Sequence, residues 1–460
     1  MKKKISLYTL SLLIIATIDS IRNLPAAALF GSSLIFFFLL AAIFFLIPIS
    51  LVSAELSAAF PEKGGVYEWV RKAFGDKMGM TAIWLQWINT MVWYPTMLSF
   101  IAGSAAYLIN PELAENKYYL ISFVMIAFWT LTLINLKGMH FSSKINSICV
   151  VFGTMIPMCL LIALGIAWAT SKEPIHIDFS YKHLIPSLGT SHNWISLTAI
   201  MASFLGMELA GVHVSDIQNP QRNFPKAIGY AVLFIVFSML LGSLAIAIVL
   251  PSGEIHLVDG VMQVFNEFFH TFHLEPIVPW IALAIVIGST GGLINWLSAP
   301  AKGLLHAAEF GFLPPILRKV NQHGVPTNIL LTQALLVSVF CALFLFVPTI
   351  NTFYWFLTDL STELYMMMYV LVFCSVLRLR TRHNRHPTCF KIPGGEVGLW
   401  GISLLGIVGC GITLFVGFFP PDTLSISSTW WYALMIGAGN LLLLSPLPLF
   451  FLYKRKYIDR

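Results

Sequence analysis

Residues 16–25 read ATIDSIRNLP and lie inside an apolar stretch long enough to cross a lipid bilayer as a helix. This stretch contains two ionisable side chains, Asp19 and Arg22, together with Pro25, which lacks a backbone N–H and can interrupt a helix. An ionised carboxylate at the centre of a membrane helix costs about 2.5 to 3.5 kcal/mol even on the scales that give the lowest values. We therefore expect a broken helix here, with polar residues that have either a partner or a function.

A second stretch of the same kind, residues 202–211, reads ASFLGMELAG. Gly206 is free to adopt unusual backbone angles and marks the expected break. The carboxylate of Glu208, like that of Asp19, needs a partner or a function that offsets the cost of burying it in a membrane helix. Two interpretations are open. Arg22 forms a structural ion pair with Asp19 or Glu208, or at least one of the three belongs to a substrate or proton site.

The chain as a whole has the composition of a membrane protein. Of its 460 residues, 57% are hydrophobic and 10% are charged, whereas charged residues make up about 25% of an average soluble protein. So few charges cannot cover a water-soluble surface, which excludes a soluble multidomain enzyme. Apolar windows of about 20 residues predict an all-α membrane protein with 12 transmembrane helices, at residues 8–30, 34–56, 78–108, 118–136, 146–169, 194–216, 226–250, 277–306, 327–348, 352–377, 398–419 and 429–452.

The basic residues support this order of spans, because cytoplasmic loops of membrane proteins are enriched in Lys and Arg. The chain has 27 Lys and Arg residues. With the N-terminus placed in the cytoplasm, all of them lie on the cytoplasmic side except Lys117, Lys172 and Lys182, which lie outside, and Arg22, which lies within a span. We interpret the basic start and residues 5–18 as a retained first span rather than a cleaved signal peptide. Both termini are therefore expected in the cytoplasm.

The two interrupted spans are the first and the sixth, and each opens a group of five. Because five is an odd number, the second group is inverted relative to the first, which is the pattern of an inverted repeat whose broken helices 1 and 6 meet near the bilayer midplane. We expect a single transmembrane domain over residues 1–460. Residues 1–169 form its first five-helix repeat, residues 190–377 its second, and residues 398–453 helices 11 and 12.

The breaks predict a binding site for a small zwitterion, since a broken helix frees backbone N–H groups on one half and C=O groups on the other. An aromatic residue beside such a site can wall or gate it. A desolvated carboxylate can also take up a proton, which assigns a proton or gating role to Glu208 and Asp19. The predicted substrate-binding residues are Thr17, Ile18, Asp19, Ser20, Arg22, Ser203, Phe204, Gly206 and Trp296.

Other functional classes lack the motifs that they need. The six cysteines form no CxxC pair and the twelve histidines no HExxH motif, so we expect no metal, no cofactor and no enzymatic activity. No basic stripe interleaved with aromatic residues indicates nucleic-acid binding. The expected partners are a small amino-acid substrate and the lipid bilayer, and the oligomeric state stays open.

Three stretches resemble the amino acid, polyamine and organocation (APC) transporter superfamily. They are residues 61–70, PEKGGVYEWV, residues 206–228 with the segment NPQRNFPKAI, and residues 296–326. Residues 390–395, FKIPGG, and 419–422, FPPD, are most similar to the bacterial glutamate/GABA antiporters. The first break departs from the glycine-rich pattern of many relatives.

This resemblance implies a LeuT-like fold of five plus five inverted helices and amino-acid exchange by alternating access. It also implies that Glu208 is a proton-sensitive or conformational residue and that Trp296 and Phe204 are gates. We therefore expect an amino-acid antiporter of the bacterial inner membrane, which exchanges an acidic amino acid for its decarboxylation product. The alternative is a proton-coupled amino-acid or polyamine symporter on the same fold, with Asp19 as proton carrier.

Overall fold

The computed structural model describes residues 6–60, 65–138, 149, 151–186, 191–209, 220–347, 349–382, 390–421 and 428–457. Within these ranges the regular secondary structure is helical, and no strand is present. The first half contains α1 (Leu7–Ile18), η1 (Ile21–Asn23), α2 (Leu24–Ala28), η2 (Gly31–Ser33), α3 (Leu34–Ala41), η3 (Ala42–Leu46), α4 (Ile47–Ala59), α5 (Val66–Phe74), α6 (Asp76–Ala106), η4 (Pro111–Glu115), α7 (Lys117–Leu136), η5 (Val151–Met155), α9 (Ile156–Thr170), α10 (Tyr181–Leu184) and α11 (Ser191–Ser203).

The second half contains the longest helices of the molecule. Its elements are α12 (Pro220–Val249), η7 (Ser252–Glu254), α13 (Gly260–Thr271), η8 (Glu275–Ile277), α14 (Val278–Glu309), η9 (Pro315–Arg318), α15 (Thr327–Leu343), η10 (Phe344–Phe346), α16 (Ile350–Arg382), α17 (Gly395–Val416), α18 (Thr429–Leu444) and α19 (Pro446–Tyr457). Two of the elements named, η3 and η5, are π-helical turns.

Within the described ranges, nine helices are long and apolar enough to cross a membrane. They coincide with the predicted second, fourth, fifth and seventh to twelfth spans. The first and sixth predicted spans are interrupted, and the third, α6, carries Gln86, Asn89 and Thr90 in its buried middle. The all-α fold class is confirmed for the described part of the chain. The total of twelve spans, the inverted repeat and the division of the domain stay predictions.

The first interruption lies at Asp19 and Ser20. Helix α1 ends at Ile18, and both following residues are extended, with ψ of 109° and 112°. The expectation that Pro25 marks this break is wrong. Pro25 lies in the first turn of α2, where a helix has no use for the missing N–H, so it starts the second half of the span instead of interrupting it.

The second interruption lies where it is predicted, at Gly206. Helix α11 ends at Ser203, and the chain turns through Gly206, whose φ is +104°. A side chain rarely tolerates this backbone conformation. Residues 207–209 form one further helical turn, and residues 210 and 211 of the predicted stretch lie outside the described residues.

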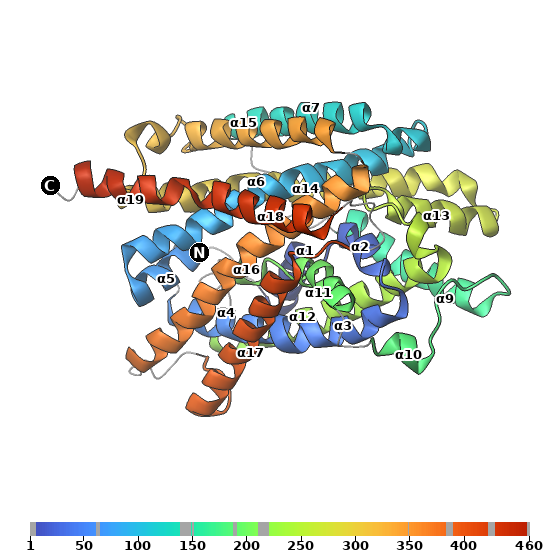
Figure 1. Ribbon diagram of the computed structural model, residues 1–460, viewed down its shortest axis with the longest axis horizontal. Coiled ribbons are helices and arrows are strands. Elements are labelled where there is room, and N and C mark those ends of the chain that lie inside the picture. Colours follow the sequence, from blue (N-terminus) through green and yellow to red (C-terminus); the bar gives the residue numbers. More distant parts are fainter. Residues whose placement is uncertain are drawn as a thin grey trace.

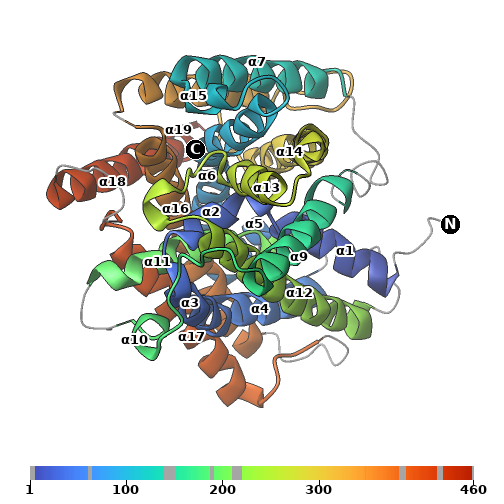
Figure 2. The same cartoon turned by 90° about the vertical axis from the view of Figure 1, so that its right-hand side faces the viewer.

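The helices form one bundle whose ends are covered by shorter elements (Figure 1). Helices α7 and α15 pack against each other at one edge in both views (Figures 1 and 2), next to α6 and α14. Helix α16 packs on α6 and α17, and α1 packs on α12. Helix α5 lies near one end of the bundle, and α10 and α13 lie near the other (Figure 1).

Helix contacts beside the two interruptions depend on glycine. A Cβ added to Gly153 in η5 would lie 2.2 Å from the Cα of Gly288 in α14 and 2.5 Å from the carbonyl oxygen of Ala284. Both atoms belong to the backbone and cannot move aside alone. Small residues at such crossings let membrane helices approach closely and gain packing energy.

Gly153→Ala is therefore expected to lower the free energy of unfolding by roughly 1 to 3 kcal/mol, because the added methyl group forces η5 away from α14. The matched control is Gly229→Ala in α12, where an added Cβ meets nothing within 4 Å. Thermal unfolding in detergent measures both variants. Equal stability of Gly153→Ala and Gly229→Ala would contradict the close approach.

Candidate functional site

A cavity of about 100 Å³ lies between the two interruptions. This is the size of one small ligand, since an engineered cavity of about 150 Å³ holds benzene. Residues Ile18 to Asn23 of the first break line it. The remaining wall residues are Asn89, Thr90, Trp93 and Met97 of α6, Thr154 of η5, Ala202, Ser203 and Leu205 at the second break, Gly288, Ser289, Gly292, Leu293 and Trp296 of α14, and Ser361 and Tyr365 of α16.

Most of the predicted substrate-binding residues face this cavity, and some lie beside it. Its lining includes Ile18, Asp19, Ser20, Arg22, Ser203 and Trp296. Phe204 packs against Phe38, with ring centroids 5.8 Å apart, and neither it nor Gly206 or Glu208 is part of the lining. The side chain of Thr17 lies outside the described residues.

Arg22 is a buried positive charge whose neighbours are uncharged. The residue is 4% exposed. Its Nη1 donates hydrogen bonds to Thr96 Oγ1 at 2.7 Å and to Tyr354 Oη at 3.4 Å, and its guanidinium carbon lies 5.4 Å from the centroid of the Trp93 ring. Its Nε has no hydrogen-bond partner within the described ranges. Arg22 therefore lines the cavity with a charge that has no ion-pair partner and a donor that no described residue accepts from.

Asp19 is the negative counterpart on the same interrupted segment. It is 4% exposed, its Oδ2 accepts a hydrogen bond from Ser238 Oγ at 3.1 Å, and no described residue donates to its Oδ1. The structural ion pair considered from the sequence does not form, because neither Asp19 nor Glu208 is among the partners of Arg22 in the described chain. Both charges thus keep an unused polar atom.

The hydrogen bond that holds the backbone of Trp296 depends on Pro300, four residues later in α14. Pro300 lies inside α14 and has no N–H, so the carbonyl of Trp296, four residues earlier, loses its helical donor. Tyr94 Oη donates to that carbonyl at 2.9 Å, and the Trp93 ring packs on the Trp296 ring with centroids 5.4 Å apart. The indole is thereby held against the second break, 3.6 Å from the point that a Cβ on Gly206 would occupy.

Glu208 anchors the second break to two long helices. Its Oε1 accepts hydrogen bonds from Gln86 Nε2 at 3.0 Å and from Tyr365 Oη at 2.8 Å, and its Oε2 accepts one from Tyr369 Oη at 2.5 Å. Tyr369 Oη in turn accepts the N–H of Gly206 at 2.8 Å. The carboxylate therefore connects α6, α16 and the turn that ends the sixth span.

Sequence reasoning missed the hydroxyl groups that hold the two charges. Thr96 and Ser238 also donate to carbonyls of their own helices, at 2.8 Å and 3.2 Å, as membrane hydroxyls commonly do, so nothing in the sequence distinguishes them. Asn89 was detectable, because it is an amide inside an apolar span. Within the described ranges, no group of three or more His, Cys, Asp and Glu side chains is arranged to hold a metal ion.

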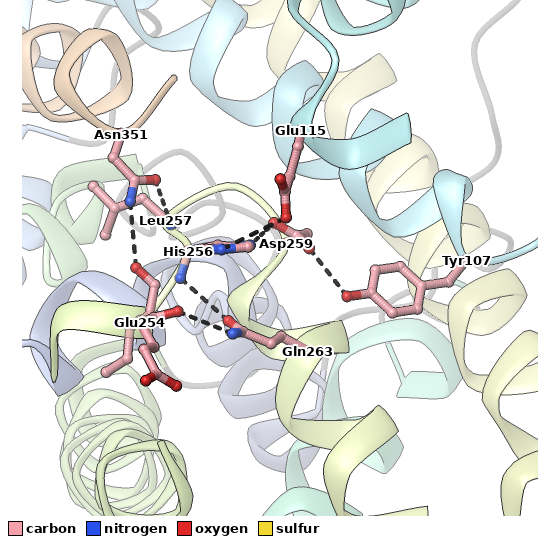
Figure 3. Close-up of polar contacts among 9 residues, drawn as sticks. Tyr107, Glu115, Glu254, His256, Leu257, Asp259, Gln263 and Asn351 are labelled. Carbon is pink, nitrogen blue, oxygen red and sulfur yellow. Dashed lines mark hydrogen bonds and ion pairs between the residues drawn. The ribbon is translucent and has the colours of Figure 1, made fainter. Parts of the chain in front are cut away.

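A second polar cluster surrounds His256 in the loop between α12 and α13 (Figure 3). His256 Nδ1 lies 3.2 Å from Asp259 Oδ1 and its Nε2 lies 3.9 Å from Glu115 Oε1. Tyr107 Oη donates to Asp259 Oδ2 at 3.0 Å, and the N–H of Leu257 donates to Asn351 Oδ1 at 2.9 Å. The loop is thus tied to the end of α6, to η4 and to the start of α16.

The hydrogen bond with Asp259 raises the pKa of His256 above 6.5, and the negative charges of Asp259 and Glu115 add to this, while partial burial opposes it. A raised pKa in the folded state stabilises the protein below the pKa of histidine in the unfolded chain, about 6.5. That contribution is lost as the pH rises through the folded-state pKa.

His256→Gln is therefore expected to lower the melting temperature at about pH 5 and to leave it nearly unchanged at about pH 9. Thermal unfolding of the purified protein at both pH values measures this. The control is His323→Gln, whose exposed ring contacts the neighbouring Gln322. A loss of stability equal at both pH values would contradict a charge effect.

Membrane-length helices around one buried cavity, placed where two interrupted segments meet, are the architecture of a transporter for a small solute. The protein is a multi-span membrane transporter and not an enzyme. The chain belongs to the amino acid permease family of the APC superfamily, whose model matches residues 5–440.

Among the proteins similar to this chain, the following three align with nearly its whole length. A Legionella pneumophila protein described as an uncharacterized transporter is 38% identical, over 98% of this chain and 97% of its own length. The glutamate/gamma-aminobutyrate antiporter of Lactococcus lactis is 29% identical, over 95% of this chain and 88% of its own length. A probable agmatine/putrescine antiporter of the same species is 22% identical, over 95% and 92%. The resemblance to the APC superfamily and to the glutamate/GABA antiporters is confirmed.

Proposed function

We propose that this chain is an amino-acid antiporter of the bacterial inner membrane, which exchanges an acidic amino acid for its decarboxylation product by alternating access. The observation that carries the proposal is the pair of buried, opposite charges on the first break. Arg22 and Asp19 each keep one polar atom that no described residue pairs with, and both line the cavity. The names of the antiporter relatives support the exchange mode.

The two charges suit both members of such an exchange pair. Decarboxylation of an acidic amino acid removes the α-carboxylate and leaves the amine and the side-chain carboxylate. In the proposed complex the ammonium group binds Asp19 and the side-chain carboxylate binds Arg22, so the same two contacts serve substrate and product. The additional α-carboxylate of the substrate faces the polar side chains of Ser20 and Asn89, which line the same cavity.

The exchange would also consume protons in the cell, because each decarboxylation takes up one proton and the exchange exports its product. In this proposal Trp296 and Phe204 are gates, Glu208 changes its hydrogen bonds during the transport cycle, and both termini lie in the cytoplasm. Gly206 supplies the turn that such a rearrangement needs. The inverted five-helix repeat relates the two breaks.

Exchange is tested with purified protein in proteoliposomes and radiolabelled glutamate. We expect uptake to require an internal amino acid or its decarboxylation product and to stay near background in empty vesicles. Uptake into empty vesicles that follows an imposed proton gradient would overturn antiport. It would support a proton-coupled amino-acid or polyamine symporter, for which Asp19, a buried carboxylate with a free Oδ1, would be the proton carrier.

Arg22→Gln is expected to raise the KM for an acidic amino acid by about tenfold or more, because it removes a desolvated charge–carboxylate contact. Arg22→Lys keeps the charge but not the planar donor pattern, so its KM should lie between the two. Lys319→Gln, a change of the same charge at an exposed position, is the control. An unchanged KM in Arg22→Gln would exclude Arg22 as the carboxylate contact.

A further inference from the structure

Two carboxylates lie in the bundle beyond the substrate cavity, one turn apart on α16. Asp359 is 1% exposed and Glu363 is 0% exposed. Asp359 Oδ2 accepts a hydrogen bond from Tyr432 Oη at 2.7 Å, and Glu363 Oε2 accepts one from the side-chain amide of Asn440. Both donors come from α18.

The two remaining carboxylate oxygens converge on one point. Among the residues that the structure describes, Asp359 Oδ1 and Glu363 Oε1 find no hydrogen-bond partner. A Cβ added to Gly417, at the end of α17, would lie 3.0 Å from the first and 2.7 Å from the second. The amide oxygen of Asn440, itself 5% exposed, is unpartnered as well. Two of these buried acceptors therefore lie around the same point, the third belongs to a residue that contacts Glu363, and no described residue donates to any of them.

No positive side chain of the described residues forms an ion pair with these two carboxylates. None of the ion pairs in the described part of the chain includes Asp359 or Glu363. The titratable group that faces them from α18 is Tyr432, and α17 presents Gly417. Two adjacent ionised carboxylates without a counter-charge are very costly in a dry interior, so the site must hold a positive charge from solution.

A proton fits this site better than a metal ion. A hard metal cation needs about six oxygen ligands or retained waters, whereas the described residues offer three free oxygens. One proton needs only a donor–acceptor pair. The proton would bond covalently to Glu363 Oε1 and form a hydrogen bond to Asp359 Oδ1. By turning its amide, Asn440 could present its NH₂ group to ionised Glu363 or its oxygen to protonated Glu363.

We propose that Asp359 and Glu363 form a proton-binding site that takes up one proton from water and, when it releases this proton again, slows transport. The link to transport is α16 itself. On other faces of this helix, Tyr354 holds Arg22 and Tyr365 holds Glu208. Release of the proton leaves two like charges facing each other, which repel and displace α16 together with both of these contacts. This link to transport rests on the proposed function, whereas proton binding itself does not.

Infrared difference spectroscopy of the purified protein during a pH titration tests proton binding without any transport. We expect the stretching band of a protonated carboxyl group that disappears as the pH is raised, and that is missing or shifted in Glu363→Gln and in Asp359→Asn. Glu112→Gln, the same change at an exposed residue, is the control. A band that persists unchanged in both buried variants would overturn the proposal. So would a stabilisation by sodium or magnesium that Glu363→Gln abolishes.

Exchange in proteoliposomes tests the effect on transport. The native protein is expected to lose exchange activity as the pH rises. Glu363→Gln, which stays neutral, should keep its activity over at least about one further pH unit.

Gly417→Ala retains both acids but places a methyl group beside their free oxygens, so we expect it to alter the pH profile of exchange. Its control is Gly411→Ala, where an added Cβ meets nothing within 4 Å, and this variant should keep the native pH profile. Identical pH profiles in Glu363→Gln and the native protein would refute the link. If no variant exchanges substrate at all, the proposed function fails and the infrared result still decides proton binding.

Discussion

The rest of the site depends on the buried charge of Arg22, which forms no ion pair with any described residue. Arg22 cannot lose its proton, and burial removes most of the water that would solvate it. Thr96 and Tyr354 accept hydrogen bonds from Arg22 Nη1, and the Trp93 ring faces the guanidinium group. None of these groups carries a negative charge. This charge without an ion-pair partner is the feature on which the proposed binding of a carboxylate substrate depends.

Helix α16 connects the polar groups that the two interruptions leave inside the bundle. Its residues contact Arg22 through Tyr354, Asn89 through Ser361, and Glu208 through Tyr365 and Tyr369. The same helix carries the second pair of carboxylates towards α17 and α18. A change in protonation on one face of a rigid helix can therefore change the geometry on another, because the side chains share one backbone.

The helical class and nine of the membrane spans could be predicted from the sequence, and the lining of the cavity only partly. The order of apolar segments indicates the spans, since a membrane helix must be apolar over its length. Gly206 marks the second break because few other residues adopt a φ of +104°. Pro25 was misleading, since a missing N–H is as compatible with the start of a helix as with its interruption. Asp19 and Ser20, which break the first span, have no sequence signature beyond their polarity.

The sequence by itself determined that this protein lies in a membrane, that its first and sixth spans combine charges with helix-breaking residues, and to which family of transporters it belongs. Only the tertiary structure decided how each buried charge is satisfied. Arg22 finds Tyr354, which is 332 positions away, and the carbonyl that Pro300 frees finds Tyr94 on another helix. Composition reports the solvent that surrounds a helix, because a helix that crosses a lipid bilayer must be apolar over its length. Hydrogen-bond partners depend on which faces of distant helices meet, and no local pattern encodes that.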